Sequence, residues 1–80
     1  METRVAVMSI IVENTSSIEA LNSILHEHRQ HIIGRMGLPY HQKNINIISI
    51  AIDAPQDEIS AMSGKIGNLD GVSVTIAFSK

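Results

Sequence analysis

Two strand-like segments, residues 4–12 and 45–53, constrain the fold of this 80-residue chain more than any other feature. Both are rich in isoleucine and valine, whose β-branched side chains favour extended backbone. Alternate residues of a strand point to opposite faces of a sheet, and in these two segments both sets are largely apolar. Each segment therefore needs apolar cover on both faces, which one layer of helices cannot provide.

Two amphipathic segments can form a helical layer over one of these faces. We expect a first helix over residues 17–28, where Ser16 and Glu19 fit a capping box at its start. We expect a second over residues 55–67, where Pro55 suits the first turn and the acidic residues Asp57 and Glu58 suit the helix dipole. The apolar stripes that would face the sheet are Ile18, Leu21, Ile24 and Leu25 in the first helix and Ile59, Met62 and Ile66 in the second.

The remaining segments complete the order strand, helix, strand, strand, helix, strand. Residues 31–36 predict a weak second strand, residues 37–44 predict a loop because they contain Gly37, Pro39 and Asn44, and residues 72–78 predict a final strand. This order is the βαββαβ pattern of the ferredoxin-like fold, an α+β architecture with an antiparallel sheet in the order 4-1-3-2 and two helices on one face. We therefore expect a single ferredoxin-like domain over residues 1–80.

The second apolar face of the predicted sheet indicates self-association. A chain of this length buries only about 60% of its unfolded surface, and the absence of cysteine removes disulfides as a further source of stability. We expect a homo-oligomer built through the face that the helices leave open, and the alternative is a monomer that tolerates an exposed apolar face. The predicted contact residues are Val5, Val7, Ile11, Ile45, Ile47 and Ala51.

Three of the four histidines lie in the short segment HEHRQH, residues 26–31. Successive helical residues turn by about 100°, so His26 and His28 point to different sides and cannot share one metal ion. The metal-site hypothesis therefore uses His28, His31 or His41, completed by ligands from another subunit. The alternative is that the histidines end a helix, where partial positive charge suits the exposed carbonyl groups.

A second candidate site is the segment GRMGLPYH, residues 34–41, which joins two expected strands. Loops held by a rigid scaffold often carry binding residues. Arg35 can bind a carboxylate or a phosphate, and Tyr40 offers an aromatic ring and a hydroxyl, so these two with Gly37 and His41 form the predicted ligand site. The alternative is a hairpin whose Gly37 and Pro39 set the turn and whose Tyr40 packs against the protein.

The composition argues against several classes of function. The formal net charge is −2, and no helix-turn-helix or basic ribbon is evident, so we expect no direct binding of nucleic acid. The apolar run over residues 5–12 is too short to span a membrane, and we expect a cytoplasmic protein. The spacing of His, Ser and Asp indicates neither a catalytic triad nor an acid–base pair, so we expect no enzymatic activity.

Four segments, RVAVMSIIVE, ILHEH, IIGRMGLPY and ISAMSGKIGNLDGVSV, resemble the iron-only hydrogenase system regulators, and the resemblance extends over nearly the whole chain. It implies an ACT-like domain, similar to the effector-binding part of nickel-responsive repressors. It also implies dimers or tetramers that bind small effectors or metals at subunit interfaces. The chain has no cysteine, so the thiolate ligand of nickel-responsive repressors has no counterpart here.

The residues and the resemblance together predict a regulatory module rather than an enzyme. We expect a homo-oligomer that senses a small ligand or a metal and passes the signal to a protein partner, in connection with the iron-only hydrogenase system. The alternative is a ligand-free structural or adaptor oligomer in hydrogenase maturation. The sequence identifies neither the effector nor a cofactor.

Overall fold

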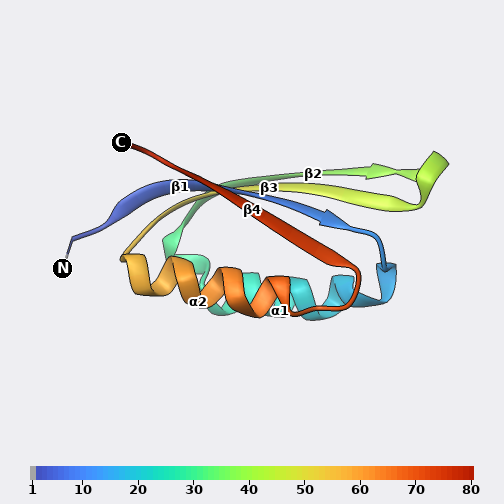
Figure 1. Cartoon of the computed structure of the whole chain (residues 1–80), viewed down its shortest axis with the longest axis horizontal. Coiled ribbons are helices and arrows are strands. Elements are labelled where there is room, and N and C mark those ends of the chain that lie inside the picture. The colour runs from blue at the N-terminus through green and yellow to red at the C-terminus, as the bar shows by residue number, and fades with distance from the viewer. Residues whose placement is uncertain (1) are drawn as a thin grey trace.

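The computed structural model describes residues 2–80, which form two layers, an antiparallel sheet and a pair of helices (Figure 1). The strands are β1 (Arg4–Val12), β2 (Ile32–Tyr40), β3 (Ile45–Ala54) and β4 (Val72–Phe78), the helices are α1 (Ile18–Glu27) and α2 (Gln56–Gly67), and the short 3-10 turns are η1 (Thr15–Ser17), η2 (Arg29–His31) and η3 (His41–Lys43). The sheet order is β2-β3-β1-β4, so β1 and β3 are central, as the predicted order 4-1-3-2 requires. The ferredoxin-like α+β fold is therefore confirmed.

Both helices cover the same face of the sheet, and the hydrophobic core lies between the two layers (Figure 1). Alternate residues of the central strands point into it, so Met8 and Ile10 in β1 and Ile50 and Ile52 in β3 are fully buried. Burial of one such side chain stabilises the fold by about 1.5–3 kcal/mol. The other core residues, which include two of the four residues of the first predicted helical stripe and all three of the second, are Ala6, Val12, Leu21, Leu25, Ile48, Ala54, Ile59, Met62 and Ile66.

The connection from β1 to α1 differs from the prediction at its cap. Ser16 and Glu19 do not form a capping box, because the η1 turn precedes α1 and Asn14 caps that turn instead. The side-chain oxygen of Asn14 accepts hydrogen bonds from the backbone N–H of Ser16 at 3.0 Å and from its hydroxyl at 2.7 Å. Both helices begin one residue after their predicted starts, since Ser17 and Pro55 are the N-cap residues.

Gly71 lies in the turn before β4 and contacts the residues that follow β1, at a position that only glycine fits. Its φ angle is +69°, and a Cβ atom there would lie 2.6 Å from the Cβ of Asn14. The carbonyl of Gly71 accepts a hydrogen bond from the N–H of Glu13 at 2.7 Å, and Asn14 Nδ2 donates to Asp70 at 2.6 Å. The Ser17 hydroxyl donates to the carbonyl of Asp70 at 2.7 Å, so these contacts hold the start of α1 under the sheet.

β2 is longer than predicted, because residues 37–40 continue the strand instead of forming a loop. Its pairing with β3 extends from Ile32 to Tyr40 and is interrupted only by a bulge before Gly34. Pro39 has no N–H to donate, but β2 is an edge strand with a single neighbour, so the missing donor is tolerated. The connection to β3 shrinks to η3 and Asn44, which has a left-handed φ of 55°. The β2–β3 hairpin thus reaches beyond the helical layer (Figure 1).

Candidate functional site

The sheet face opposite the helices is apolar and has no cover in the single chain. Four of the six predicted contact residues, Val5, Val7, Ile11 and Ile47, are each 38–43% exposed. Cross-strand pairing places Val7 directly beside Ala51, and Ile11 directly beside Ile47. The two central strands therefore present one continuous surface that contains all six predicted contact residues, Val5, Val7, Ile11, Ile45, Ile47 and Ala51.

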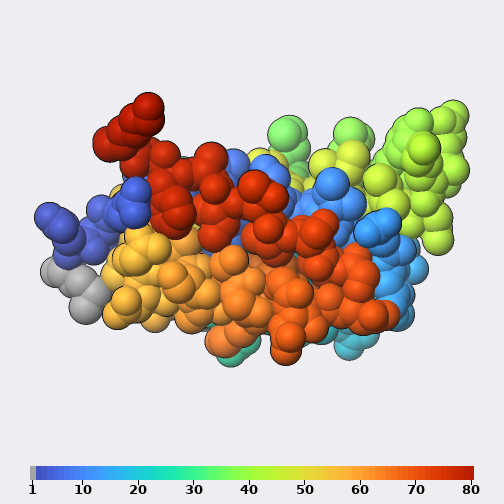
Figure 2. All heavy atoms as spheres, viewed as in Figure 1, coloured from blue at the N-terminus to red at the C-terminus, as the bar shows by residue number. Residues whose placement is uncertain are grey.

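β2 extends this surface with three side chains that are not among the six predicted contact residues. Leu38 pairs with Ile47 and Tyr40 pairs with Ile45, while Met36 lies beside a serine of β3. Met36 and Leu38 are 70% and 60% exposed, and side chains of β2 project from this face in Figure 2. The predicted loop over residues 37–44 concealed Leu38 and Tyr40, because a loop has no defined face, and Met36 lay in the weak strand predicted over residues 31–36, whose faces were not assigned. The open sheet face consists of Val5, Val7, Ile11, Met36, Leu38, Tyr40, Ile45, Ile47 and Ala51.

The open sheet face is almost free of charge. At the positions of β1, β2, β3 and β4 that point to this side, Asp53 is the one charged residue, and it lies at the end of β3 beside Val5. Ser9, Ser49 and Thr75 form a hydroxyl row across the middle of the face. The face therefore suits contact with another apolar protein surface rather than with a strongly charged ligand.

A groove of about 290 Å³ lies on the other side of β2, between that strand and α1. Arg35 reaches this groove because it pairs with Ile50, a core residue, whereas the next residue, Met36, points to the open sheet face. Leu25 and Ile32 provide apolar lining next to the core. The α1–β2 groove is lined by Asn22, Leu25, His26, Arg29, Ile32 and Arg35.

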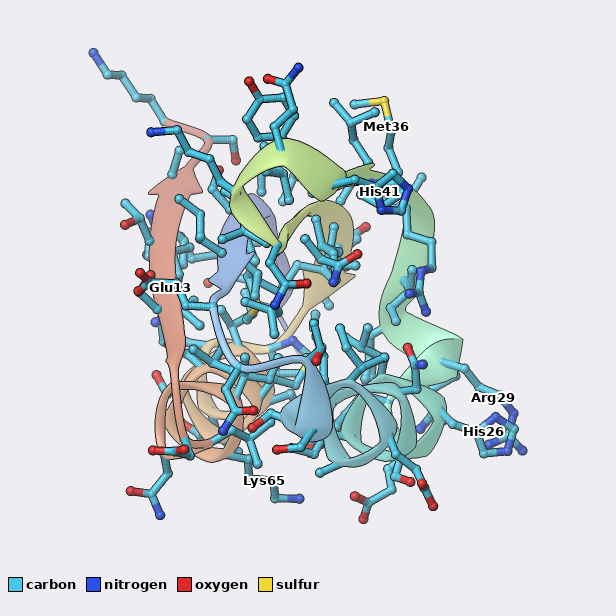
Figure 3. The ribbon with its side chains drawn as sticks, turned by 90° about the vertical axis from the view of Figure 1, so that its right-hand side faces the viewer. Glu13, His26, Arg29, Met36, His41 and Lys65 are labelled. Carbon is cyan, nitrogen blue, oxygen red and sulfur yellow. The ribbon has the colours of Figure 1, made fainter. Side chains whose placement is uncertain are left out.

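The α1–β2 groove is cationic. Arg29 donates from Nη1 to the carbonyl of His26 at 2.9 Å, which holds its guanidinium near the end of α1. Arg35 donates from Nη2 to Oδ1 of Asn22 at 3.3 Å, which joins β2 to α1. Figure 3 shows His26 and Arg29 projecting together from the end of the helix. The six lining residues include no carboxylate, so this positive charge is not neutralised within the groove.

His28 joins the two helices and does not face open solvent. It is 8% exposed, and its Nδ1 lies 3.1 Å from Oε2 of Glu58, in the first turn of α2. Its Nε2 lies 3.5 Å from Nζ of Lys65, so a neutral ring that carries its proton on Nδ1 satisfies both contacts. His31 Nε2 lies 3.8 Å from the same oxygen of Glu58. The sequence placed Glu58 correctly in the first helical turn but missed this pairing, which depends on the antiparallel packing of α1 and α2 (Figure 1).

The structure does not bring the three predicted metal ligands together. His28 and His31 lie at the end of α1, whereas His41 lies in η3 at the opposite end of the molecule (Figure 1). Within residues 2–80, no group of three or more His, Cys, Asp or Glu side chains is arranged to hold a metal ion. Over the same residues, neither helix has the length and apolar character needed to cross a membrane.

The four predicted ligand-binding residues are also divided, because three of them belong to a strand rather than a loop and the fourth, His41, follows that strand. Arg35 and Gly37 pair with Ile50 and Ile48 and so lie on the helix side of β2. Tyr40 lies on the open sheet face, and its hydroxyl donates to Gln42 at 2.7 Å, while His41 belongs to η3. Of this set, Arg35 alone lines the α1–β2 groove.

Comparisons with known proteins agree with this architecture. The chain superposes on the structure of uncharacterized protein TM1266 from Thermotoga maritima with a TM-score of 0.95 and 31% sequence identity, over 99% of this chain and 100% of the other. It also matches a formyltetrahydrofolate deformylase from Pseudomonas putida KT2440 with a TM-score of 0.66 and 10% identity, over 91% of this chain but 28% of that chain, a likeness of fold alone. Comparison with curated proteins gave no match.

A family profile decides where the chain belongs. The TM1266-like family, described as "Iron-only hydrogenase system regulator, putative", matches residues 4–76. These residues include all four strands and both helices, apart from the end of β4. The resemblance seen in the sequence is therefore confirmed, and the chain belongs to the TM1266-like family of iron-only hydrogenase system regulators.

Proposed function

We propose that the protein is a homo-oligomeric regulatory module that binds a small effector and passes the signal to a protein partner. The observation that carries this proposal is the open sheet face, which presents apolar side chains from three adjacent strands. Contiguous apolar surfaces of this kind mark sites of protein–protein contact. Membership of a family of hydrogenase system regulators supports a regulatory rather than a catalytic role.

A second copy of the chain is the occupant that best fits the open sheet face. A two-fold contact brings the same patch of both subunits together, so any charge near its centre meets a like charge. Here the centre is the hydroxyl row and its apolar neighbours, while Asp53 lies at the end of β3. The face can therefore meet itself without repulsion.

The α1–β2 groove supports the sensing part of the proposal better than the histidines do. Both ring nitrogens of His28 already contact Glu58 and Lys65, so a metal ion there would displace existing partners. The groove instead offers hydrogen-bond donors and apolar side chains beside an open volume. This composition suits binding rather than bond cleavage, and we propose no catalytic step for the chain.

Light scattering at micromolar concentration tests the oligomer. The 8.7 kDa chain should give a mass that is a multiple of this value. Ile47→Glu should give a monomer, because burying an unpaired carboxylate costs several kcal/mol. Ser60→Glu, at an exposed position of α2, adds the same charge outside the open sheet face and should keep the wild-type mass. A monomeric wild-type protein would overturn the proposal.

A thermal-shift screen separates the sensor from the ligand-free adaptor. A ligand that binds the folded state raises the melting temperature by mass action. We expect a shift with small organic anions and none with divalent metals in the untagged protein. If no ligand in a screen of anions, amino acids and metals stabilises the protein, an adaptor role in hydrogenase maturation becomes the better description.

A further inference from the structure

We infer that the α1–β2 groove binds a small oxyanion, a carboxylate or phosphate group that carries a short aliphatic body, and this inference rests on the proposed sensing function. The groove lies apart from the histidine contacts between the helices and from the open sheet face. Its lining combines guanidinium groups with aliphatic side chains, and each part constrains the ligand.

The guanidinium groups of Arg29 and Arg35 determine which head group the ligand must have. Each guanidinium has five N–H donors, and the structure uses one of them in the hydrogen bond from Arg35 to Asn22 and one in the bond from Arg29 to His26. Among residues 2–80, neither arginine forms an ion pair. Their remaining donors match the paired oxygens of a carboxylate or phosphate, which arginine binds with two parallel hydrogen bonds.

The aliphatic lining and the volume limit the body of the ligand. Leu25 is almost fully buried and Ile32 is partly buried against the core, so the floor of the groove is apolar. A groove of about 290 Å³ is at the lower end of the range for small-molecule sites. A chain of a few carbon atoms attached to the anionic group fits both observations.

The absence of a carboxylate among the lining residues sets the specificity. A zwitterionic amino acid would place its ammonium group beside Arg29 and Arg35 with no acidic partner in the groove. This arrangement costs the desolvation of a charge without a compensating ion pair. The groove therefore selects simple organic anions against amino acids of the same carbon skeleton.

The groove stays open when two copies associate through the open sheet face, because the two surfaces lie on opposite sides of β2. Arg35 points to one side and Met36 to the other. The same strand thus contributes residues to the ligand site and to the proposed interface. A shift of β2 on ligand binding therefore moves residues of both surfaces.

Titration followed by NMR chemical shifts tests the inference on the wild-type protein. The probes are 4-methylpentanoate, leucine, which has the same skeleton with an added ammonium group, and inorganic phosphate. We expect 4-methylpentanoate to shift the amide signals of Asn22, Ile32 and Arg35, and to bind at least about tenfold more tightly than leucine. Phosphate distinguishes the two head groups: tighter binding of phosphate assigns the site to phosphorylated ligands, and tighter binding of 4-methylpentanoate assigns it to carboxylates.

Arg35→Gln and Arg29→Gln should each weaken binding by about tenfold or more, because each removes a charge-assisted hydrogen bond. Lys43→Gln, which removes one positive charge in η3 at the far end of the hairpin, should change the affinity by less than about twofold. The spectra of the variants show directly that they are folded. Absence of binding by both anions, equal binding of leucine, or unchanged affinity in both arginine variants overturns the inference. None of these results alters the mass measured by light scattering, which tests the oligomer separately.

Discussion

Ile10 and Ile11 are neighbouring isoleucines of β1 in opposite environments. Ile10 is fully buried under the helices, whereas Ile11 is 42% exposed on the open sheet face. Both faces of the two central strands are largely apolar, and the helical layer covers one face and leaves the other open (Figure 1). The comparison teaches that apolar residues in this chain have two roles: one face stabilises the fold, and the other is available for association.

The largest predicted effect contrasts these two isoleucines directly. Ile10→Ala should lower the free energy of unfolding by about 2–5 kcal/mol, because it removes buried methyl groups and leaves a cavity. Ile11→Ala loses the same atoms and the same strand propensity but leaves no cavity, so it should cost less than about 1 kcal/mol in the monomer. Urea denaturation over a range of protein concentrations measures both values.

The concentration dependence sharpens the contrast. Association stabilises the folded state by mass action, so the cost of Ile11→Ala should grow with protein concentration, whereas that of Ile10→Ala should change little. Equal costs of the two substitutions at every concentration would remove the distinction between the faces.

The covered face is the side of the sheet under the two helices. It also depends on the junction of Asn14, Asp70 and Gly71, which holds the start of α1 in place, and Gly71→Ala tests this junction. The added methyl group would lie 2.6 Å from Asn14 Cβ, at a φ of +69°. We expect a loss of about 1–3 kcal/mol in the free energy of unfolding from the strained conformation. Gly64→Ala is the matched control, because a methyl group added to this exposed helical glycine would meet no atom within 4 Å, and alanine should stabilise the helix by about 0.5–1 kcal/mol. A similar loss in both variants, measured by thermal denaturation, would contradict the role of the junction.

The sequence predicts the covered face well because strand and helix periodicities are local. The strand over residues 72–78 and both helical stripes need only neighbouring residues to be recognised, and the structure has them in place. β2 was shortened in the prediction because Gly37 and Pro39 disfavour a strand. Continuous pairing with β3, a contact between distant residues, outweighs that preference at the edge of the sheet.

The sites were harder to predict, because they also depend on contacts between residues that are distant in the sequence. Strand alternation identified the apolar face of β1 and β3. Leu38 was missed because residues 37–44 were predicted as a loop, whereas Met36 lay within the predicted second strand and was not assigned to this face. The α1–β2 groove combines Asn22 and Arg29 with Arg35, and no motif connects these residues along the chain. Arg35 lay in the strand predicted over residues 31–36, but its pairing with Ile50 of β3 is what places it on the side that faces α1.

The smallest predicted effect concerns the polar contact between His28, at the end of α1, and Glu58, in the first turn of α2. Glu58→Ala removes the partner of the buried His28 Nδ1 as well as a first-turn carboxylate, so we expect a loss of about 1 kcal/mol for the partly exposed contact in addition to the helix-dipole contribution. Asp57→Ala removes the same charge from the same helical turn without breaking that contact, so it should cost only the helix-dipole contribution, about 0.3–1 kcal/mol at most. Chemical denaturation of both variants gives the difference between them. If Asp57→Ala costs as much as Glu58→Ala, the carboxylates act through the helix dipole alone, and the contact with His28 does not hold the helical layer together.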